Sequence, residues 1–195
     1  MHKQVILITG TPCVGKTTVA KSLTKKLDAL YVNLTDTAKK YDLTLGEDKE
    51  RQTTIIDEDR MKSKLGEIID SAQKDSVIID GHYAAAIVSK NQVSRTFVLR
   101  RNPVQLREFM VKCGFKDQKL WENLASEILD VCLVEALNNQ DQKRVCELDV
   151  TDKTVEEIIE DILAILNNNK VCRTGGIDWL GMLEQEGKLD EYLRM

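Results

Sequence analysis

Short apolar runs alternate along the chain with longer stretches in which apolar residues recur at every third or fourth position. Most of the runs are rich in β-branched residues, which is typical of strands buried on both faces of a sheet. They occupy residues 5–8, 30–33, 76–80, 96–99 and 145–150. The longer stretches have the period of amphipathic helices and cover about residues 19–27, 35–41, 57–72, 103–111, 119–137 and 155–166. Strands that alternate with helices predict an α/β fold with a five-stranded parallel sheet covered on both faces.

Three stretches interrupt this alternation. Residues 42–54 are polar and without period, so we expect a mobile segment there. Residues 112–116 contain a glycine and separate two helices. From Asn167 onwards, asparagines and the Gly175-Gly176 pair predict a separate tail with one or two short amphipathic helices. The tail either packs on the core or serves as a partner-binding element; we expect the former, with no contribution to the chemistry.

Length and charge narrow the class of protein. The chain has 195 residues and a formal net charge of −4. The length fits one domain with an appendage, and the charge provides no global field that would attract nucleic acid. No apolar run is long enough to span a membrane, and the first strand begins too close to Met1 for a signal peptide. We therefore expect a cytoplasmic protein with no membrane partner.

The cysteines are five in number, widely scattered and without a C-x-x-C pair. An odd, dispersed set predicts reduced intracellular thiols and argues against both a disulfide framework and a zinc site. The five are Cys13, Cys113, Cys132, Cys146 and Cys172.

The first candidate for chemistry follows the first strand, where residues 10–18 read Gly-Thr-Pro-Cys-Val-Gly-Lys-Thr-Thr. This is the G-x-x-x-x-G-K-[ST] pattern of a phosphate-binding loop, placed between a strand and a helix as that loop requires. Its backbone N–H groups and the helix N-terminus are expected to bind phosphate oxygens. Lys16 is expected at the β- and γ-phosphates, and the Thr17 hydroxyl on Mg²⁺. The predicted ATP phosphate-binding set is Gly10, Cys13, Val14, Gly15, Lys16, Thr17 and Thr18.

A second candidate is Asp80, the acid that ends the apolar run 76–80. In a parallel sheet this residue lies at the same edge as the loop, where it can hold Mg²⁺. The alternative is a surface aspartate that begins a turn before Gly81. His82 either orients a water or phosphate, or is a partly buried histidine with its hydrogen bonds satisfied.

A phosphate acceptor needs further cations. Lys39 and Arg60 are candidates, although a solvated surface charge is the alternative for each. Arg60 is the better candidate because a guanidinium can direct two donors onto one phosphate. Arg100 and Arg101 follow the strand 96–99 and are placed to face the nucleotide, with interstrand packing or surface pairing as the alternative.

Four features together resemble the adenylate kinase isoenzyme 6 family, a branch of the nucleoside monophosphate kinases, and in particular its archaeal members. They are the loop at 10–18, the Asp57-Glu58-Asp59-Arg60 run, the Asp80-x-His82 pair and the helix with Glu122, Asn123 and Glu127. The resemblance runs from Gln4 to about Leu166. It implies a P-loop NTPase three-layer fold in residues 1–166, with a nucleoside-monophosphate-binding segment at about 33–56, a short lid at about 111–120, and a C-terminal extension at 167–195.

The resemblance also implies an activity. ATP and AMP are the expected substrates, with Mg²⁺ as cofactor and ATPase activity alongside. Catalytic roles fall on Lys16, Asp80, His82 and Arg60, acceptor binding on Asn33, Lys39 and Arg60, and metal binding on Thr17 and Asp80. Family members assist assembly of the small ribosomal subunit and rRNA maturation, so a platform ribosomal protein and the pre-ribosomal particle are expected partners.

The chain departs from the family pattern at the loop, the acceptor site and the lid. Cys13 replaces the usual third glycine, which requires a negative φ, and its thiol beside the loop N–H groups is expected to have a lowered pKa. Lys39 stands where the kinases generally carry arginine. Phe109 and Cys113 occupy the positions of the two lid arginines, and Arg107 and Lys112 are the nearest substitutes in sequence.

The functions left open are therefore a nucleoside monophosphate kinase, a slow ATPase that drives assembly, and a nucleotide-gated binding protein. The absence of lid arginines favours the ATPase, and Lys39 and Arg60 favour the kinase. A GTPase is disfavoured because no Asn-Lys-x-Asp guanine motif follows the later strands.

Overall fold

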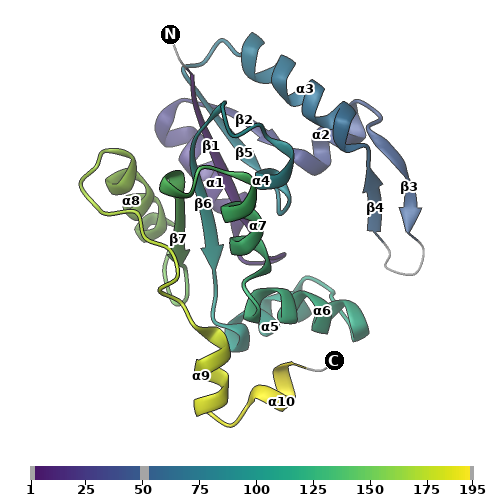
Figure 1. Cartoon of the computed structure of the whole chain (residues 1–195), viewed down its shortest axis with the longest axis vertical. Helices are drawn as coiled ribbons and strands as arrows, with labels where there is room; N and C mark the ends of the chain where they lie inside the picture. Colours follow the sequence, from purple (N-terminus) through teal and green to yellow (C-terminus); the bar gives the residue numbers. More distant parts are fainter. Residues whose placement is uncertain (1–2, 49–52, 194–195) are drawn as a thin grey trace.

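The computed structural model describes residues 3–48 and 53–193. Among them, a five-stranded sheet forms the centre in the order β2-β5-β1-β6-β7, and every neighbouring pair is parallel (Figure 1). Its strands are β1 (Gln4–Gly10), β2 (Leu30–Asn33), β5 (Ser76–Asp80), β6 (Val93–Arg100) and β7 (Val145–Asp149). The predicted α/β fold with five parallel strands is confirmed.

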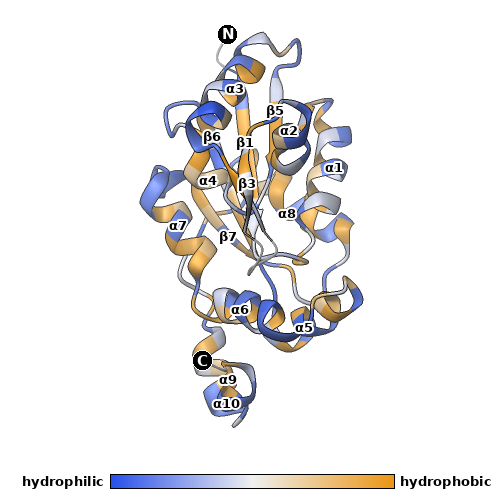
Figure 2. Ribbon diagram, turned by 90° about the vertical axis from the view of Figure 1, so that its right-hand side faces the viewer, coloured by the Kyte–Doolittle hydropathy of each residue, from blue (hydrophilic) through white to orange (hydrophobic). Residues whose placement is uncertain are grey.

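Helices cover both faces of this sheet, so the predicted three layers are also confirmed. Alternate side chains of β1 point to opposite faces of the sheet. Ile6 and Ile8 belong to one apolar core, and Val5 and Leu7 belong to the other. The first core contains α1 (Lys16–Leu27) and α8 (Val155–Leu166), and the second contains α3 (Glu58–Ser71) and α4 (Ala84–Ile87). In Figure 2 the apolar colour gathers on the strands and on the inner sides of these helices.

The remaining elements of the described ranges connect the strands, pack against the sheet or belong to the tail. They are α2 (Leu34–Lys40), β3 (Thr44–Asp48), β4 (Thr53–Ile56), α5 (Pro103–Lys112), α6 (Asp117–Ile128), α7 (Val131–Asn139), the 3₁₀ turn η1 (Gln142–Arg144), α9 (Trp179–Gln185) and α10 (Leu189–Tyr192). Figure 1 shows α5 and α6 beyond the ends of β6 and β7, with α9 and α10 next to them.

The predicted single helix over 119–137 is wrong. Two helices, α6 and α7, replace it, and Asp130 between them has a φ of 58°. Its carboxylate accepts a hydrogen bond of 2.5 Å from Arg100 Nη2. The apolar period continues through the break, so the pattern alone did not reveal it.

The segment 42–54 was predicted to be mobile. Its residues 49–52 lie outside the described residues, and on either side of them β3 pairs with β4 in an antiparallel ribbon. Ribbon residues Leu45 and Ile55 are exposed (69% and 48%). A ribbon whose described side chains are mostly exposed has little need for an apolar alternation, which explains why the sequence carried no strand signal.

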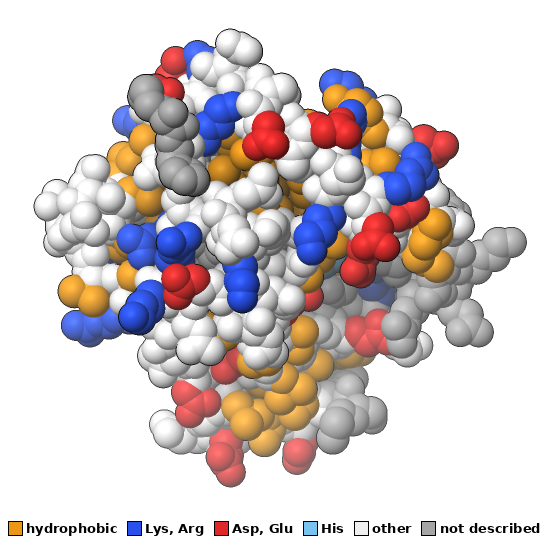
Figure 3. All heavy atoms as spheres, turned by 45° about the horizontal axis from the view of Figure 1, so that its top comes forward, with side chains coloured by type: hydrophobic (Ala, Val, Ile, Leu, Met, Phe, Trp, Pro, Cys, Tyr) orange, Lys and Arg blue, Asp and Glu red, His pale blue; other side chains and the backbone are white. Residues whose placement is uncertain are grey.

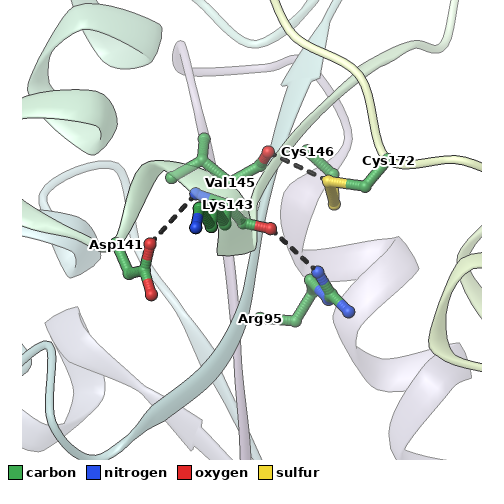
Figure 4. The surroundings of a disulfide bond; sticks show 6 residues. All are labelled: Arg95, Asp141, Lys143, Val145, Cys146 and Cys172. Carbon is green, nitrogen blue, oxygen red and sulfur yellow. Dashed lines mark hydrogen bonds between the residues drawn. A yellow bond between two sulfur atoms is a disulfide. The ribbon is translucent and has the colours of Figure 1, made fainter.

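The prediction of reduced cysteines fails for one pair. Cys146 on β7 and Cys172 in the tail form a disulfide (Figure 4). The tail returns along the outer edge of β7, where the N–H of Glu147 donates to the Arg173 carbonyl at 2.8 Å. The two cysteines are 26 positions apart in sequence, and this return of the chain brings them together.

The surface carries charges of both signs. In Figure 3, basic and acidic side chains both occur across the face that is shown, as the small net charge leads one to expect. No helix in the described ranges is long and apolar enough to cross a membrane.

Candidate functional site

The loop between β1 and α1 has the backbone of a phosphate-binding loop. Gly10 and Gly15 have φ values of +135° and +111°, which disfavour a side chain. A Cβ at Gly10 would lie 2.4 Å from the carbonyl oxygen of Leu99 on β6. The glycine therefore permits the close approach of loop and strand. Val14 is buried and anchors the loop in the core, while Thr18 is exposed in the first turn of α1.

Lys16 turns back into this loop. Its Nζ donates to the carbonyl oxygen of Thr11 at 2.8 Å. Burial lowers the pKa of Lys16, and the nearby Asp80 and Glu127 carboxylates act in the opposite direction. The ammonium group thus lies in a poorly hydrated position, where its attraction to an anion is little screened.

Asp80 is the centre of a second set of contacts. It is almost completely buried (1% exposed), and its Oδ2 accepts hydrogen bonds from three groups. The donors are Thr17 Oγ1 at 2.7 Å, Tyr31 OH at 2.8 Å and Asn33 Nδ2 at 3.0 Å. The register of the sheet explains this meeting, because Asp80 lies beside Asn33 of β2 and Ile8 of β1. Burial, followed by the bond to Asp80, raises the pKa of Tyr31 to about 12 and keeps its hydroxyl proton in place.

The Thr17 and Asp80 oxygens fit Mg²⁺. Both are hard oxygen ligands, and they lie within hydrogen-bond distance of each other. Mg²⁺ is usually held by one or two such groups together with water and substrate phosphates. The described residues include no group of three or more His, Cys, Asp or Glu side chains that could hold a metal ion.

His82 follows β5 and lies near Lys16. Packing of neighbouring atoms around the ring, although the residue as a whole is exposed, lowers the pKa of His82 to about 4, and the Lys16 charge acts in the same direction. The imidazole is therefore neutral at pH 7. The backbone carbonyl oxygen of His82 accepts a hydrogen bond from Thr9 Oγ1 at 2.8 Å, which connects the segment after β5 to β1.

Both expectations for Cys13 are wrong. Its φ is +65°, so a cysteine occupies a left-handed position that favours glycine. Burial raises the pKa of its thiol to about 12, and the neighbouring Cys113 thiol adds to the effect, while Lys16 opposes it only in part. Desolvation of the thiolate thus outweighs the influence of the loop amides.

Among the predicted acceptor residues, Asn33 contacts the site directly. It binds Asp80 and also accepts the N–H of Asp36 as the N-cap of α2. Lys39 is exposed in the last turn of α2. Arg60 is exposed in the first turn of α3, 3.9 Å from the Asp57 carboxylate.

The two arginines at the end of β6 have different surroundings, and the buried partners of Arg100 were not among the alternatives expected from the sequence. Arg100 is buried (1% exposed) and binds the carboxylates of Glu127 and Glu147 at 2.9 Å and 2.6 Å, so it is an ion-pairing residue. Arg101 lies against the phosphate loop. Its Nε and Nη2 are both 3.4 Å from the Val14 carbonyl oxygen, and its guanidinium lies 4.8 Å from the centre of the Phe109 ring.

The structure also shows where the suggested lid substitutes lie. Arg107 pairs with Glu191 at 3.2 Å and lies over the Trp121 ring, which directs it towards the tail. Lys112 lies 5.6 Å from the centre of the Phe109 ring. Phe109 and Cys113 are exposed on α5. Besides Lys16 itself, Arg101 is therefore a cation that contacts the loop.

Sequence reasoning missed the roles of Tyr31 and Glu127. Glu127 is buried (1% exposed) and accepts a hydrogen bond of 2.5 Å from Thr11 Oγ1 of the phosphate loop. A signal was present, because Glu127 shares the apolar face of α6 with Leu120 and Leu124. A carboxylate at such a position requires buried donors. Tyr31 gave no comparable signal, since a tyrosine in a strand is ordinary.

Comparison with known proteins agrees with this geometry. Residues 6–130 match the AAA domain family. A Thermococcus kodakarensis protein named "Putative adenylate kinase" is 38% identical, over 98% of this chain and 99% of its own length. A Methanocaldococcus jannaschii protein of the same name is 35% identical, over 89% of this chain and 92% of its own.

Solved structures show the same fold at much lower identity. Shikimate kinase from Acinetobacter baumannii has a TM-score of 0.61 at 15% identity and covers 86% of this chain and 95% of its own. Thymidylate kinase from Candida albicans has a TM-score of 0.54 at 16% identity, with 88% and 97% covered. With a phosphate loop, a paired Thr17 and Asp80, and these relatives, the chain belongs to the nucleoside monophosphate kinase-like family of P-loop proteins.

Proposed function

We propose that the protein transfers the γ-phosphoryl group of ATP to a nucleoside monophosphate, with AMP as the acceptor. The observation that carries the proposal is the meeting of Lys16, Thr17 and Asp80 at one edge of the sheet. The names of the archaeal relatives support the choice of AMP. Phosphoryl transfer depends mainly on positioning and on neutralising charge, and these three residues supply both.

Each residue has a defined task in this proposal. Lys16 leaves the Thr11 carbonyl and binds the β- and γ-phosphate oxygens, while the loop N–H groups bind the other oxygens of the triphosphate. Thr17 and Asp80 would hold Mg²⁺, which would supply positive charge at the phosphates when bound. Tyr31 and Asn33 keep the Asp80 carboxylate in place through their hydrogen bonds. Neutral His82 accepts a hydrogen bond from an acceptor group or water.

A second candidate function is slow ATP hydrolysis. The specific observation is that Phe109 and Cys113 present no charge on the exposed face of α5. A water can then compete with AMP as the acceptor. We propose that Arg101 supplies part of the missing charge, since it is the arginine next to the loop. Lys39 and Arg60, whose side chains are exposed, stay the proposed acceptor-binding cations.

A role in assembly of the small ribosomal subunit stays a prediction that rests on the family resemblance. The same holds for the platform ribosomal protein and the pre-ribosomal particle. A cytoplasmic location, predicted from the lack of a membrane span and a signal peptide, also stays a prediction. The domain boundaries at 166 and 167, the acceptor segment and the lid also remain proposals.

The test is to incubate the protein with Mg-ATP alone and with each nucleoside monophosphate in turn, and to separate ADP from inorganic phosphate. A kinase produces ADP without phosphate and only with an acceptor. An ATPase produces equal amounts of ADP and phosphate without one. Lys16→Ala serves as the blank for both activities. Binding of Mg-ATP without any turnover would contradict both proposals and favour a nucleotide-gated binding protein.

A further inference from the structure

The buried carboxylate of Glu127 connects the phosphate loop to the C-terminal tail. Its Oε2 accepts from Thr11 Oγ1 at 2.5 Å. Its Oε1 accepts from Arg100 Nε at 2.9 Å, from the backbone N–H of Arg101 at 3.0 Å and from Trp179 Nε1 at 3.1 Å. Three donors thus converge on Oε1 and one on Oε2, so both oxygens of this buried carboxylate are hydrogen-bonded.

Trp179 brings the tail into this network. It is the first residue of α9 and is 8% exposed, so its indole is enclosed by protein. Thr11, at the other side of Glu127, also provides the carbonyl oxygen that holds Lys16 Nζ. A continuous series of hydrogen bonds thus runs from Trp179 through Glu127 and Thr11 to Lys16.

The chain before Trp179 is held in place as well. The N–H groups of Gly175 and Gly176 donate to Glu147 Oε2 at 2.8 Å and 3.2 Å. Glu147 in turn binds Arg100, which binds Glu127. The disulfide fixes Cys172 a few residues earlier. Residues 172–179, which we call the strap, are therefore attached at several points to the residues that support the loop.

We propose that Trp179 is a positioning residue for the phosphate loop, and that the strap presents it to Glu127. This rests on the proposed function and deepens it. Loss of the indole N–H leaves Glu127 with three donors and allows the carboxylate, and with it Thr11, to shift. A low-dielectric interior makes such a buried polar network sensitive to the loss of one member. This proposal gives the tail a role, whereas the sequence predicted that the tail has no part in the chemistry.

The first test uses the two tryptophans of the chain as a matched pair. Trp179→Phe removes the donor and retains an apolar ring. Trp121→Phe removes an indole from α6, where the ring lies under Arg107. We expect Trp179→Phe to lower kcat/KM for ATP by about tenfold, the scale of one hydrogen bond to a charged group, while Trp121→Phe stays within about twofold of the wild type. Equal values for the two variants would overturn the proposal.

A second test is spectroscopic and keeps the strap intact. In Trp121→Phe, Trp179 is the one remaining indole. Titration with Mg-ATP should shift its emission, because Lys16 leaves Thr11 and the change reaches Glu127. Adding Thr11→Val should abolish the shift, and Thr11→Ser, which retains the hydroxyl, should restore it. An emission that Mg-ATP leaves unchanged, or a shift that persists in Thr11→Val, overturns the proposal.

These tests separate the two levels of inference. Failure of the wild type to transfer phosphate to any monophosphate contradicts the proposed kinase. The emission titration requires only that the nucleotide binds, so it still decides whether Trp179 and the loop are connected.

Discussion

At the scale of single residues, the cation inside the phosphate loop and its carbonyl partner define what the site can do. Lys16 lies on the Thr11 carbonyl and is poorly hydrated, so phosphate oxygens can replace that carbonyl as its partner. We expect Lys16→Ala to reduce phosphoryl transfer and hydrolysis by about 10²–10³-fold without loss of the fold, as measured by turnover and circular dichroism. Lys25→Ala, on the exposed side of the same helix, is the matched control. Near-normal turnover in Lys16→Ala would remove the phosphate-loop assignment.

Cys13 provides a residue-scale prediction that follows from its pKa. With a pKa of about 12, its thiol is almost entirely protonated at pH 8, and the reactive thiolate increases about tenfold per pH unit up to that value. Iodoacetamide at pH 8 should therefore modify the exposed Cys113 before Cys13, as followed by peptide mass spectrometry. Raising the pH to 9 should accelerate the reaction at Cys13, and Mg-ATP should suppress it. Faster modification of Cys13 than of Cys113 would contradict the raised pKa.

At the scale of elements, α5 ends at the proposed lid, and Phe109 and Cys113 stand where the family pattern has two arginines. Phe109 lies against Arg101, and Cys113 ends the helix next to the Cys13 thiol. A cation at the transferring phosphoryl group stabilises the transition state more than the bound substrate. We expect Phe109→Arg with Cys113→Arg to raise AMP phosphorylation more than ATP affinity, as measured by steady-state kinetics and calorimetry.

The matched control for this pair is Phe109→Gln with Cys113→Gln, which adds polar length without charge. An increase of equal size in the control would show that the charge is not the cause. A wild-type turnover in the hundreds per second, typical of efficient enzymes, would show that the site already has the cation it needs. Arg101→Gln would then be the variant expected to lose it.

The same scale shows what the sequence could predict and what it could not. The strands with unbroken apolar runs and the helices with clear caps were predictable, for example α8 with Thr154 and Glu157 as its capping box. The separation of α6 from α7 was not, because it depends on a bond between Asp130 and Arg100, residues that lie far apart in sequence. The site divides similarly. Lys16, Thr17 and Asp80 follow from local motifs, whereas Tyr31, Arg101 and Glu127 gain their roles only from tertiary contacts.

At the scale of the whole molecule, one sheet edge gathers contributions from distant parts of the chain. β1 supplies the loop, β5 supplies Asp80, β6 supplies Arg100 and Arg101, and α9 supplies Trp179. A buried ion pair such as Arg100 with Glu127 is costly to form and still more costly to leave incomplete. The described part of the tail therefore belongs to the folded unit that holds the phosphate loop in place.

The bond between Cys146 and Cys172 makes part of the chain a covalent ring, which includes α8 and the exposed residues 167–171. A protease that cuts within 167–171 opens this ring without separating the pieces. The nicked protein should still migrate at about 22.1 kDa on a gel without reductant, and should release a short C-terminal fragment when reductant is added. Release of the fragment without reductant would show that the two cysteines are not joined. Because the ring keeps Trp179 attached to the core, nicked protein should retain its activity until the disulfide is reduced.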